Sequence, residues 1–309
     1  MIEVEGLRKS FGTLAAVDGL SFAVGDGEIF GLLGPNGAGK TTTINMVCGV
    51  LRPDAGRVRL AGHDVWADPL AAKRSLGVVP QEIAVYEDLT ARDNLSFWGS
   101  LYGLAGQALK ARVDEALAAV GLAERAGSRV ATFSGGMKRR LNLCMGLLSR
   151  PRVLLLDEPT VGIDPQARLG ILEVVREVAR GGTAVLYTTH YMDEAEELCD
   201  RIAIIDQGRI LTVGTLEELS RLAGEGEVIR LRGDFAAAAV RERLSRLAGV
   251  RVLGIDDRGA VLTVAPDGGG LLDVLPQLLE TEFGVEDVSV QRPSLQSVFI
   301  RLTGRELRD

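Results

Sequence analysis

Along the chain, short apolar runs alternate with longer stretches whose apolar positions recur at helical spacing. Continuous apolar runs, typical of strands buried on both faces of a parallel sheet, occur at 29–33, 153–156, 184–188 and 202–205. Residues 2–8 and 20–24 alternate like half-buried strands, and strand-like runs also cover 57–61 and 76–80. Helical spacing covers 41–50, 166–179 and 191–198. Strands that alternate with helices predict an α/β fold with a parallel sheet.

From about residue 88 to residue 149 the pattern is helical throughout. Leu109 to Val120 is amphipathic, and a second apolar stripe lies on one helical face further on. It consists of Met137, Leu141, Cys144, Met145 and Leu148. The ordinary role of such a stripe is core packing. We therefore expect a helical subdomain at about 88–149, inserted between two strands of the sheet.

Beyond about residue 224 the pattern changes, and Gly224-Glu225-Gly226 is a plausible linker. The order that follows is strand, helix, strand, strand, helix, strand. Its members are 228–232, 236–247, 250–255, 261–264, 271–282 and 285–291, and a last helix covers 294–302. This β-α-β-β-α-β order predicts a small α+β domain of the split βαβ, or ferredoxin-like, type. We expect domains at 1–222 and 226–309, the second regulatory or dimer-stabilising.

Composition and charge narrow the class of protein. A chain of 309 residues has room for two domains. The net charge of −7 argues against nucleic acid as the main partner, because duplex binding depends on Lys and Arg clusters. No apolar run approaches the ~18 residues of a membrane span, and no signal peptide is evident, so we expect a cytoplasmic location. Three widely spaced cysteines, in apolar helical stretches, predict buried free thiols.

The residues after the apolar run at 29–33 fit the phosphate-binding pattern G-x-x-x-x-G-K-[ST]. They are Gly34, Pro35, Asn36, Gly37, Ala38, Gly39, Lys40 and Thr41. Glycines let successive backbone N–H groups face phosphate oxygens, and the next helix presents its N-terminus to the same anion. Lys40 would bridge the β- and γ-phosphates, and the Thr41 hydroxyl would bind Mg²⁺. The pattern therefore predicts a nucleotide-binding loop.

Two acidic residues, Asp157 and Glu158, end the apolar run at 153–156. A carboxylate at the end of a buried strand is costly unless it holds a cation or hydrogen bonds. Mg²⁺ beside the phosphate loop would supply that partner for Asp157. Glu158 is then the candidate to polarise the attacking water. Without the loop, the same pair would be an ordinary strand end.

Two further polar residues follow strand-like runs. His190 closes the run at 184–189, at the edge of a parallel sheet where ligands collect, and its imidazole could bond the γ-phosphate. Gln81 ends the run at 76–80 and opens the helical insertion. Its amide could bind Mg²⁺ and link nucleotide state to the insertion. The alternatives are a structural histidine and a plain turn residue.

Ser134, Gly135 and Gly136 precede the apolar stripe of the insertion. By themselves they read as a helix cap, but their N–H groups form a second anion site. One chain cannot easily bring both anion sites to one phosphate, whereas two chains packed head to tail can. We therefore expect Ser134 of one chain to face the nucleotide held by Lys40 of another.

The order of these motifs over residues 1–220 resembles the ATPase domains of ABC transporters. The resemblance implies a P-loop fold that binds ATP and Mg²⁺. It assigns residues 34–42, hence also Thr42, to the phosphate loop, Phe11 to adenine stacking, and Asp164 to the family's D-loop, among the nucleotide-binding residues. The match at 133–137 departs from the usual Leu-Ser-Gly-Gly-Gln, with Phe133 and Met137 at its outer positions. The serine and glycines that carry the phosphate chemistry are retained.

The form Phe-Ser-Gly-Gly-Met-Lys-Arg-Arg at 133–140 is similar to the drug, lipid and polysaccharide exporter branch, including daunorubicin-resistance-type ATPases. This resemblance implies an ATPase subunit, as a homodimer or a heterodimer with a related ATPase. The subunit would be peripheral on the inner face of the membrane and drive a separate permease. Its own residues near Tyr86–Asn94, in the helical insertion, would contact that permease. The alternatives are an importer ATPase and a non-transport ABC protein acting on ribosomes or DNA.

Overall fold

The computed structural model describes residues 1–222, 227–233, 241, 249–256, 258–264, 285–291 and 294–303. The chain divides into two compact units, Met1–Gly214 and a second within Thr215–Glu306. The second unit begins at Thr215, earlier in the chain than the boundary expected near residue 222. The reason is that helix α8 (Leu216–Leu222) contacts helix α11 (Leu295–Thr303), which belongs to the second unit.

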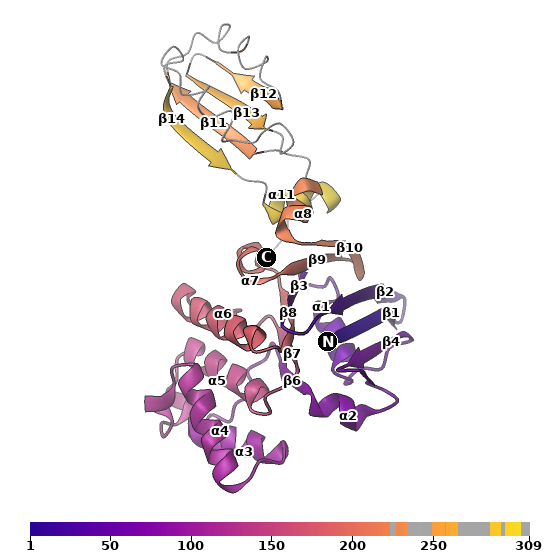
Figure 1. Ribbon diagram of the computed structural model, residues 1–309, viewed down its shortest axis with the longest axis vertical. Helices are drawn as coiled ribbons and strands as arrows, with labels where there is room; N and C mark the ends of the chain where they lie inside the picture. Colours follow the sequence, from indigo (N-terminus) through magenta and orange to yellow (C-terminus); the bar gives the residue numbers. More distant parts are fainter. Residues whose placement is uncertain are drawn as a thin grey trace. The chain divides into compact units, whose positions relative to one another are not determined.

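A mixed sheet forms the centre of the first unit (Figure 1). Its order is β10-β9-β3-β8-β7-β6, with β10 antiparallel to β9 and the other pairs parallel. The strands are β3 (Ile29–Leu33), β6 (Leu76–Val79), β7 (Val153–Asp157), β8 (Ala184–Thr189), β9 (Arg201–Asp206) and β10 (Arg209–Gly214). The predicted parallel sheet is confirmed, with β10 as an additional edge strand. Its central strands β3, β7 and β8 are buried along their whole length.

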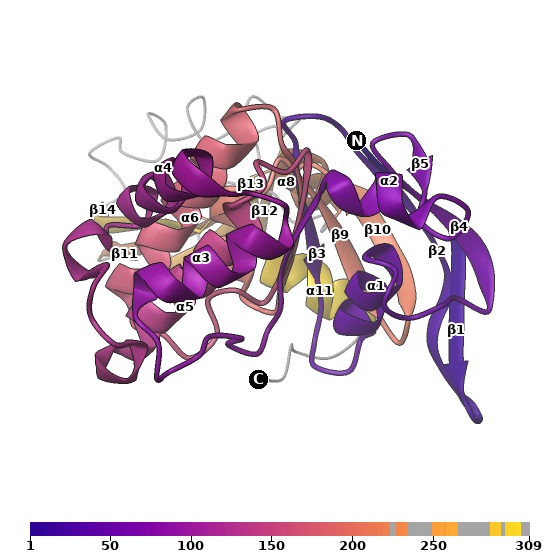
Figure 2. The same cartoon turned by 90° about the horizontal axis from the view of Figure 1, so that it is seen from below.

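An antiparallel sheet packs on one face of the central sheet (Figures 1 and 2). Its order is β2-β1-β4-β5. The strands are β1 (Ile2–Phe11), β2 (Leu14–Val24), β4 (Ala55–Leu60) and β5 (His63–Asp64), and α1 (Lys40–Val47) and α2 (Pro69–Arg74) accompany them. A tight turn joins β4 to β5, because Leu60 of β4 pairs directly with His63 of β5.

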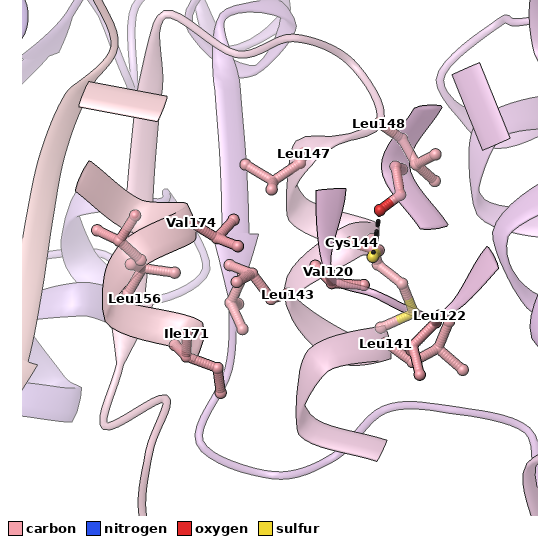
Figure 3. Packing of buried hydrophobic residues seen from close by; sticks show 14 of the residues in the cluster. Val120, Leu122, Leu141, Leu143, Cys144, Leu147, Leu148, Leu156, Ile171 and Val174 are labelled. Carbon is pink, nitrogen blue, oxygen red and sulfur yellow. Dashed lines mark hydrogen bonds between the residues drawn. The ribbon is translucent and has the colours of Figure 1, made fainter. Parts of the chain in front are cut away.

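Helices cover the other face of the central sheet. They are α3 (Ala91–Leu101), α4 (Gly106–Ala119), α5 (Gly135–Leu147), α6 (Pro165–Arg180) and α7 (Met192–Leu198), with short 3₁₀ turns at Ala123–Arg125 and Val130–Thr132. Helices α3 to α5 make up the helical subdomain. Within the stripe of α5, Cys144 donates to the Ala116 carbonyl oxygen of α4 at 3.2 Å, whereas Leu143 and Leu147 of the same helix point toward Ile171 and Val174 of α6 (Figure 3). Alternate residues of β7 serve the two faces: Leu154 and Leu156 face the helices, whereas Val153 and Leu155 face the antiparallel sheet.

The second unit contains a four-stranded antiparallel sheet among its described residues, in the order β12-β13-β11-β14. The strands are β11 (Glu227–Gly233), β12 (Val250–Ile255), β13 (Gly259–Val264) and β14 (Val285–Gln291). Ile229, Leu231 and Leu262 belong to its buried face. Apart from residue 241, the helices expected at 236–247 and 271–282 and the linker at 224–226 lie outside the described residues, so the split βαβ pattern stays a prediction.

Candidate active site

The phosphate-loop residues lie between β3 and α1, at the carboxyl end of the central sheet. Gly39 precedes α1 with a φ of +103°, in the left-handed region. A Cβ atom there would lie 2.4 Å from the Ala16 carbonyl oxygen, so only glycine fits. The loop thus wraps closely against β2 and directs the N-terminus of α1 toward the site, an arrangement that attracts anions.

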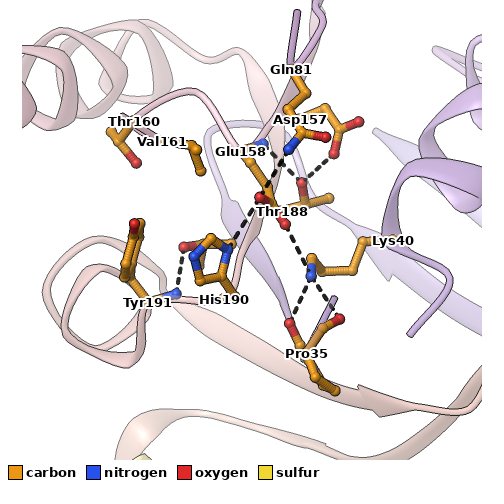
Figure 4. A network of polar contacts seen from close by, with 12 residues as sticks. Pro35, Lys40, Gln81, Asp157, Glu158, Thr160, Val161, Thr188, His190 and Tyr191 are labelled. Atoms are coloured by element: carbon orange, nitrogen blue, oxygen red, sulfur yellow. Dashed lines mark hydrogen bonds and ion pairs between the residues drawn. The ribbon is translucent and has the colours of Figure 1, made fainter. Parts of the chain in front are cut away.

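Lys40, the first residue of α1, folds its side chain back over the loop (Figure 4). Its Nζ donates to the carbonyl oxygens of Gly34 at 2.7 Å and Pro35 at 3.0 Å. It also lies 3.0 Å from Glu158 Oε1, and the two side chains are only 4% and 5% exposed. The phosphate loop and the end of β7 are therefore joined by a buried ion pair.

Glu158 connects three of the residues selected from the sequence (Figure 4). Besides Lys40, its carboxylate meets His190 Nδ1 at 3.1 Å and Gln81 Nε2 at 3.4 Å, both at Oε2. Its backbone has a φ of +45°, a strained conformation for a residue other than glycine. The N–H of Glu158 donates to Thr188 Oγ1 at 3.0 Å, which holds this conformation against β8. The strain positions the carboxylate between the three partners.

Asp157 ends β7 one residue earlier and is 3% exposed. Thr188 Oγ1 donates to its Oδ1 at 2.7 Å. Burial raises the pKa of Asp157, and hydrogen bonds from the side chains of Thr188 and Thr41 oppose that rise. A buried carboxylate beside a threonine hydroxyl is an oxygen-rich setting of the kind that Mg²⁺ prefers. The residues present therefore fit a magnesium ion.

A cavity of about 350 Å³ adjoins the phosphate loop. Its lining is Phe11, Leu14, Ala15, Ala16, Asn36, Gly37, Gly39, Lys40, Thr41, Thr42, Gln81 and Glu158. Phe11 is 51% exposed at the tip of the β1–β2 hairpin. The cavity thus offers an anion-binding loop and an exposed aromatic ring, which suits a nucleotide.

Ser134, Gly135 and Gly136 do not line this cavity; they lie against the start of α6. Ser134 Oγ accepts from the N–H of Met137 and caps α5, and Asp164 caps α6 by accepting from the N–H of Ala167. A Cβ atom on Gly136 would lie 2.7 Å from Ala167 Cβ. Two capped helix N-termini therefore adjoin one another, apart from the cavity of their own chain.

Several buried polar residues of the site were not selected from the sequence: Arg139, Asn142, Thr160, Thr188 and Glu194. Arg139 donates to the carbonyl oxygens of Gln81 and, at 3.2 Å, Val161. Asn142 Nδ2 donates to Pro80 and its Oδ1 accepts from the N–H of Ala84. Helix α5 thereby holds the segment around Gln81. In the sequence, Arg139 and Asn142 could have been noticed as polar residues within the apolar helical stretch 137–148.

The fold and this geometry define a P-loop nucleotide hydrolase. The sequence profile of the family described as ABC transporter matches residues 17–161. The chain is also 42% identical to the linearmycin resistance ATP-binding protein LnrL of Bacillus subtilis (strain 168), over the full length of both. The chain therefore belongs to the ABC transporter family and is one of its ATP-binding, ATP-hydrolysing members, as the motif order predicted.

Further relatives extend the likeness over the whole chain. The daunorubicin resistance ATP-binding protein DrrA3 of Streptomyces coeruleorubidus is 41% identical, covering 99% of this chain and 97% of its own. The Nod factor export ATP-binding protein I of Ralstonia nicotianae is also 41% identical, covering 100% and 95%. A solved ATP-binding subunit of an ABC transporter superposes with a TM-score of 0.66 at 32% identity, over 72% of this chain and 93% of that one. The resemblance to the drug-exporter branch is confirmed.

Proposed function

We propose that this chain binds and hydrolyses Mg-ATP in a head-to-tail dimer and thereby drives export through a separate membrane permease. The single observation that carries the proposal is the position of Glu158. Its carboxylate lies beside the phosphate-loop lysine and the His190 ring, at 3.0 and 3.1 Å. A general base must lie within hydrogen-bond reach of the proton that it accepts, and this position meets that requirement at the γ-phosphate end of the cavity.

The catalytic roles follow from this arrangement. Lys40 exchanges its contact with Glu158 for the β- and γ-phosphate oxygens when ATP binds, because a phosphate is the stronger partner for its ammonium. Glu158, released from Lys40, orients the attacking water and accepts its proton. His190, next to Glu158, holds the γ-phosphate. The N–H groups of residues 34–42 hold the phosphate chain.

Thr41, Gln81 and Asp157 are the residues that would hold magnesium. The ion neutralises phosphate charge when it is bound. Asp157 supplies a buried carboxylate, and Thr41 supplies a hydroxyl next to Lys40. Gln81 lines the cavity at its edge and reaches Glu158, so its amide can approach the same region. The exposed ring of Phe11, which also lines the cavity, stacks on adenine.

The dimer proposal rests on the separation between the cavity and Ser134. The residues that line the cavity come from the phosphate loop, β1, β2, Gln81 and Glu158, and Ser134, Gly135 and Gly136 are not among them. In a head-to-tail pair, Ser134, Gly135 and Gly136 of one chain cap the nucleotide of the other. Asp164, which adjoins these residues within one chain, then lies at the dimer contact. The partner is a second copy or a related ATPase.

The helical subdomain carries the proposed permease contact. Large apolar side chains are exposed along it: Ile83, Tyr86, Leu89, Phe97, Leu101 and Tyr102. The rings of Tyr86 and Phe97 meet edge to face at 5.4 Å. Asn94, fully buried, fixes the Tyr86 backbone by hydrogen bonds at 2.8 and 2.9 Å. Since Arg139 and Asn142 hold the neighbouring Gln81 segment, movement at the nucleotide can reach this apolar surface.

Export is favoured over import because the relatives are named for resistance or export.

No helix in the part of the chain that the structure describes has both the length and the apolar character needed to cross a bilayer. We therefore place the subunit on the inner face of the membrane, on a separate permease. The second unit is proposed as a regulatory or dimer-stabilising domain. Copurification with ribosomes or DNA in place of a permease would contradict this proposal.

Steady-state ATP hydrolysis by Glu158→Gln tests the site. We expect activity to fall by about 100-fold or more, while ATP still binds, because the phosphate loop is unchanged. Activity near wild type would remove Glu158 from the mechanism.

Mixing tests the dimer. A Ser134→Arg variant blocks the anion site on α5. If a dimer needs both composite sites to hydrolyse ATP, a 1:1 mixture with wild type should fall well below half of wild-type activity, because only about one dimer in four then has two intact sites. A mixture that behaves as two independent populations would contradict the head-to-tail arrangement. Asp26→Arg is the matched control, since Asp26 is an exposed residue that does not line the cavity.

A further inference from the structure

Glu194, in the first turn of α7, is fully buried, and yet its carboxylate lies among polar groups. Its Oε1 accepts from the Thr160 hydroxyl at 2.6 Å. Its Oε2 accepts from the hydroxyls of Tyr187 and Thr189, each at 2.9 Å. Arg168 Nε lies 3.6 Å from Oε1. One carboxylate therefore joins the loop after β7, the strand β8 and the helices α6 and α7.

The Thr189 hydroxyl connects this carboxylate to the histidine of the active site. It donates to Glu194 and accepts from the N–H of Tyr191 at 2.9 Å. Residue 190 lies between these two fixed positions, and its ring reaches Glu158 (Figure 4). The placement of His190 thus depends on the acceptor that orients Thr189.

The Thr160 hydroxyl connects the same carboxylate to the segment between Glu158 and Asp164. Thr160 is held from α7 by Glu194, and the next residue, Val161, is held from α5 by Arg139 at 3.2 Å. Two buried side chains of opposite charge therefore hold adjacent residues of this segment. The segment leads directly into the Asp164 cap of α6.

A fully buried carboxylate is costly, and apolar residues can often replace buried ionic groups without loss of stability. A core position usually contributes apolar packing, and a glutamate does not provide it. The burial that surrounds Glu194 is severe, since the pKa of the neighbouring Tyr187 phenol is raised by burial first and by the Glu194 charge second. What Glu194 provides instead is orientation of three hydroxyl groups in two segments of the site.

We propose that Glu194 is a positioning residue for ATP hydrolysis. It holds His190, through Thr189, and the 160–164 segment, through Thr160, in one fixed relative arrangement. The histidine that contacts the γ-phosphate and the loop that faces the partner subunit then move together. This inference rests on the proposed function of Glu158, His190 and Asp164.

Glu194→Gln is the primary test, with steady-state ATP hydrolysis by the full-length chain as the readout. Glutamine keeps the shape but offers one acceptor oxygen, so at least one buried hydroxyl loses its acceptor. We expect kcat to fall about tenfold while KM for ATP changes by less than about twofold, because the phosphate loop does not touch Glu194. Glu197→Gln is the matched control on the same helix, where Glu197 is 39% exposed and pairs with Arg176; its kinetics should equal wild type.

Two smaller changes cover the case in which Glu194→Gln does not fold. Thr189→Val removes the connection to His190, and Thr160→Val removes the connection to the 160–164 segment. Each should lower kcat with KM preserved. Wild-type kcat in both threonine variants, or a rise in KM equal to the fall in kcat, would overturn the proposal.

The Glu158→Gln and Glu194→Gln variants together distinguish failure of the Glu194 proposal from failure of the proposed function. If Glu158→Gln is inactive and Glu194→Gln matches wild type, only the positioning role of Glu194 is wrong. If Glu158→Gln matches wild type, the catalytic assignment itself is wrong.

Discussion

The ammonium of Lys40 lies 3.0 Å from the Glu158 carboxylate, and both side chains are almost fully buried. The anion-binding residue of the phosphate loop and the acidic residue after β7 thus neutralise each other. Since Lys40 also donates to two carbonyl oxygens of its own loop, its contacts must rearrange when it meets phosphate. The ion pair keeps the base and the lysine in contact until a stronger anion separates them.

Loss of one member of this pair should destabilise the fold. Lys40→Met leaves the buried Glu158 carboxylate without its cation, and we expect the free energy of unfolding to fall by about 3 kcal/mol. Adding Glu158→Gln removes the unpaired charge and should recover at least half of that loss. Urea unfolding of the two single variants and the double variant measures this. Strictly additive losses would show that the ion pair contributes nothing to the fold.

The exposed ring of Phe11 should contribute to nucleotide affinity. Phe11→Ala removes the only aromatic ring among the described lining residues of the cavity, and we expect ATP binding to weaken about tenfold. Stability should hardly change, since the ring is 51% exposed. Calorimetric titration with ATP measures the change, and Phe11→Tyr, which keeps a ring, is the control. Equal affinity of all three proteins would rule out stacking on Phe11.

Asp157 should make stability depend on pH. Burial raises its pKa in the folded state. The stability associated with the neutral carboxyl is therefore fully present below the unfolded pKa, which is about 3.9. It is lost as pH rises through the raised folded value. The Asp157→Asn variant stays neutral at every pH, so its free energy of unfolding should increase relative to that of wild type as pH rises. Urea titrations over a pH series without magnesium measure this difference, and a pH-independent difference would contradict it.

The helical subdomain should depend on the packing of α5. Leu141 is fully buried in the cluster of Figure 3, next to Leu122 and Cys144. Leu141→Ala removes three carbon atoms and leaves a cavity, which should cost about 3 kcal/mol. Leu70→Ala is the control, because Leu70 in α2 is 74% exposed and its loss should cost less than about 0.5 kcal/mol. Thermal and urea unfolding measure both, and equal stability of the two variants would contradict this account.

Element prediction succeeded where the local pattern was strong. The strand at 29–33 agrees with β3 to the residue, and the helix at 166–179 differs from α6 by one residue at each end. Short elements such as β5 and α2 were missed, because a few residues cannot establish a period. The edge strand β10 was missed too, since its half-exposed pattern becomes a strand only by pairing with β9.

The sequence by itself determined which chemical groups this protein has and which edge of the sheet receives them. Glycines, a lysine, an aspartate, a glutamate and a histidine follow strands that are parallel, and parallel strands end at one edge. Only the tertiary structure decided which groups touch. The strained Glu158 contacts Lys40 and His190, and Glu194 accepts hydrogen bonds from three hydroxyl groups. Both sets of contacts form because side chains distant in sequence share one buried volume. Those contacts depend on the register of strands and helices, which no local pattern specifies.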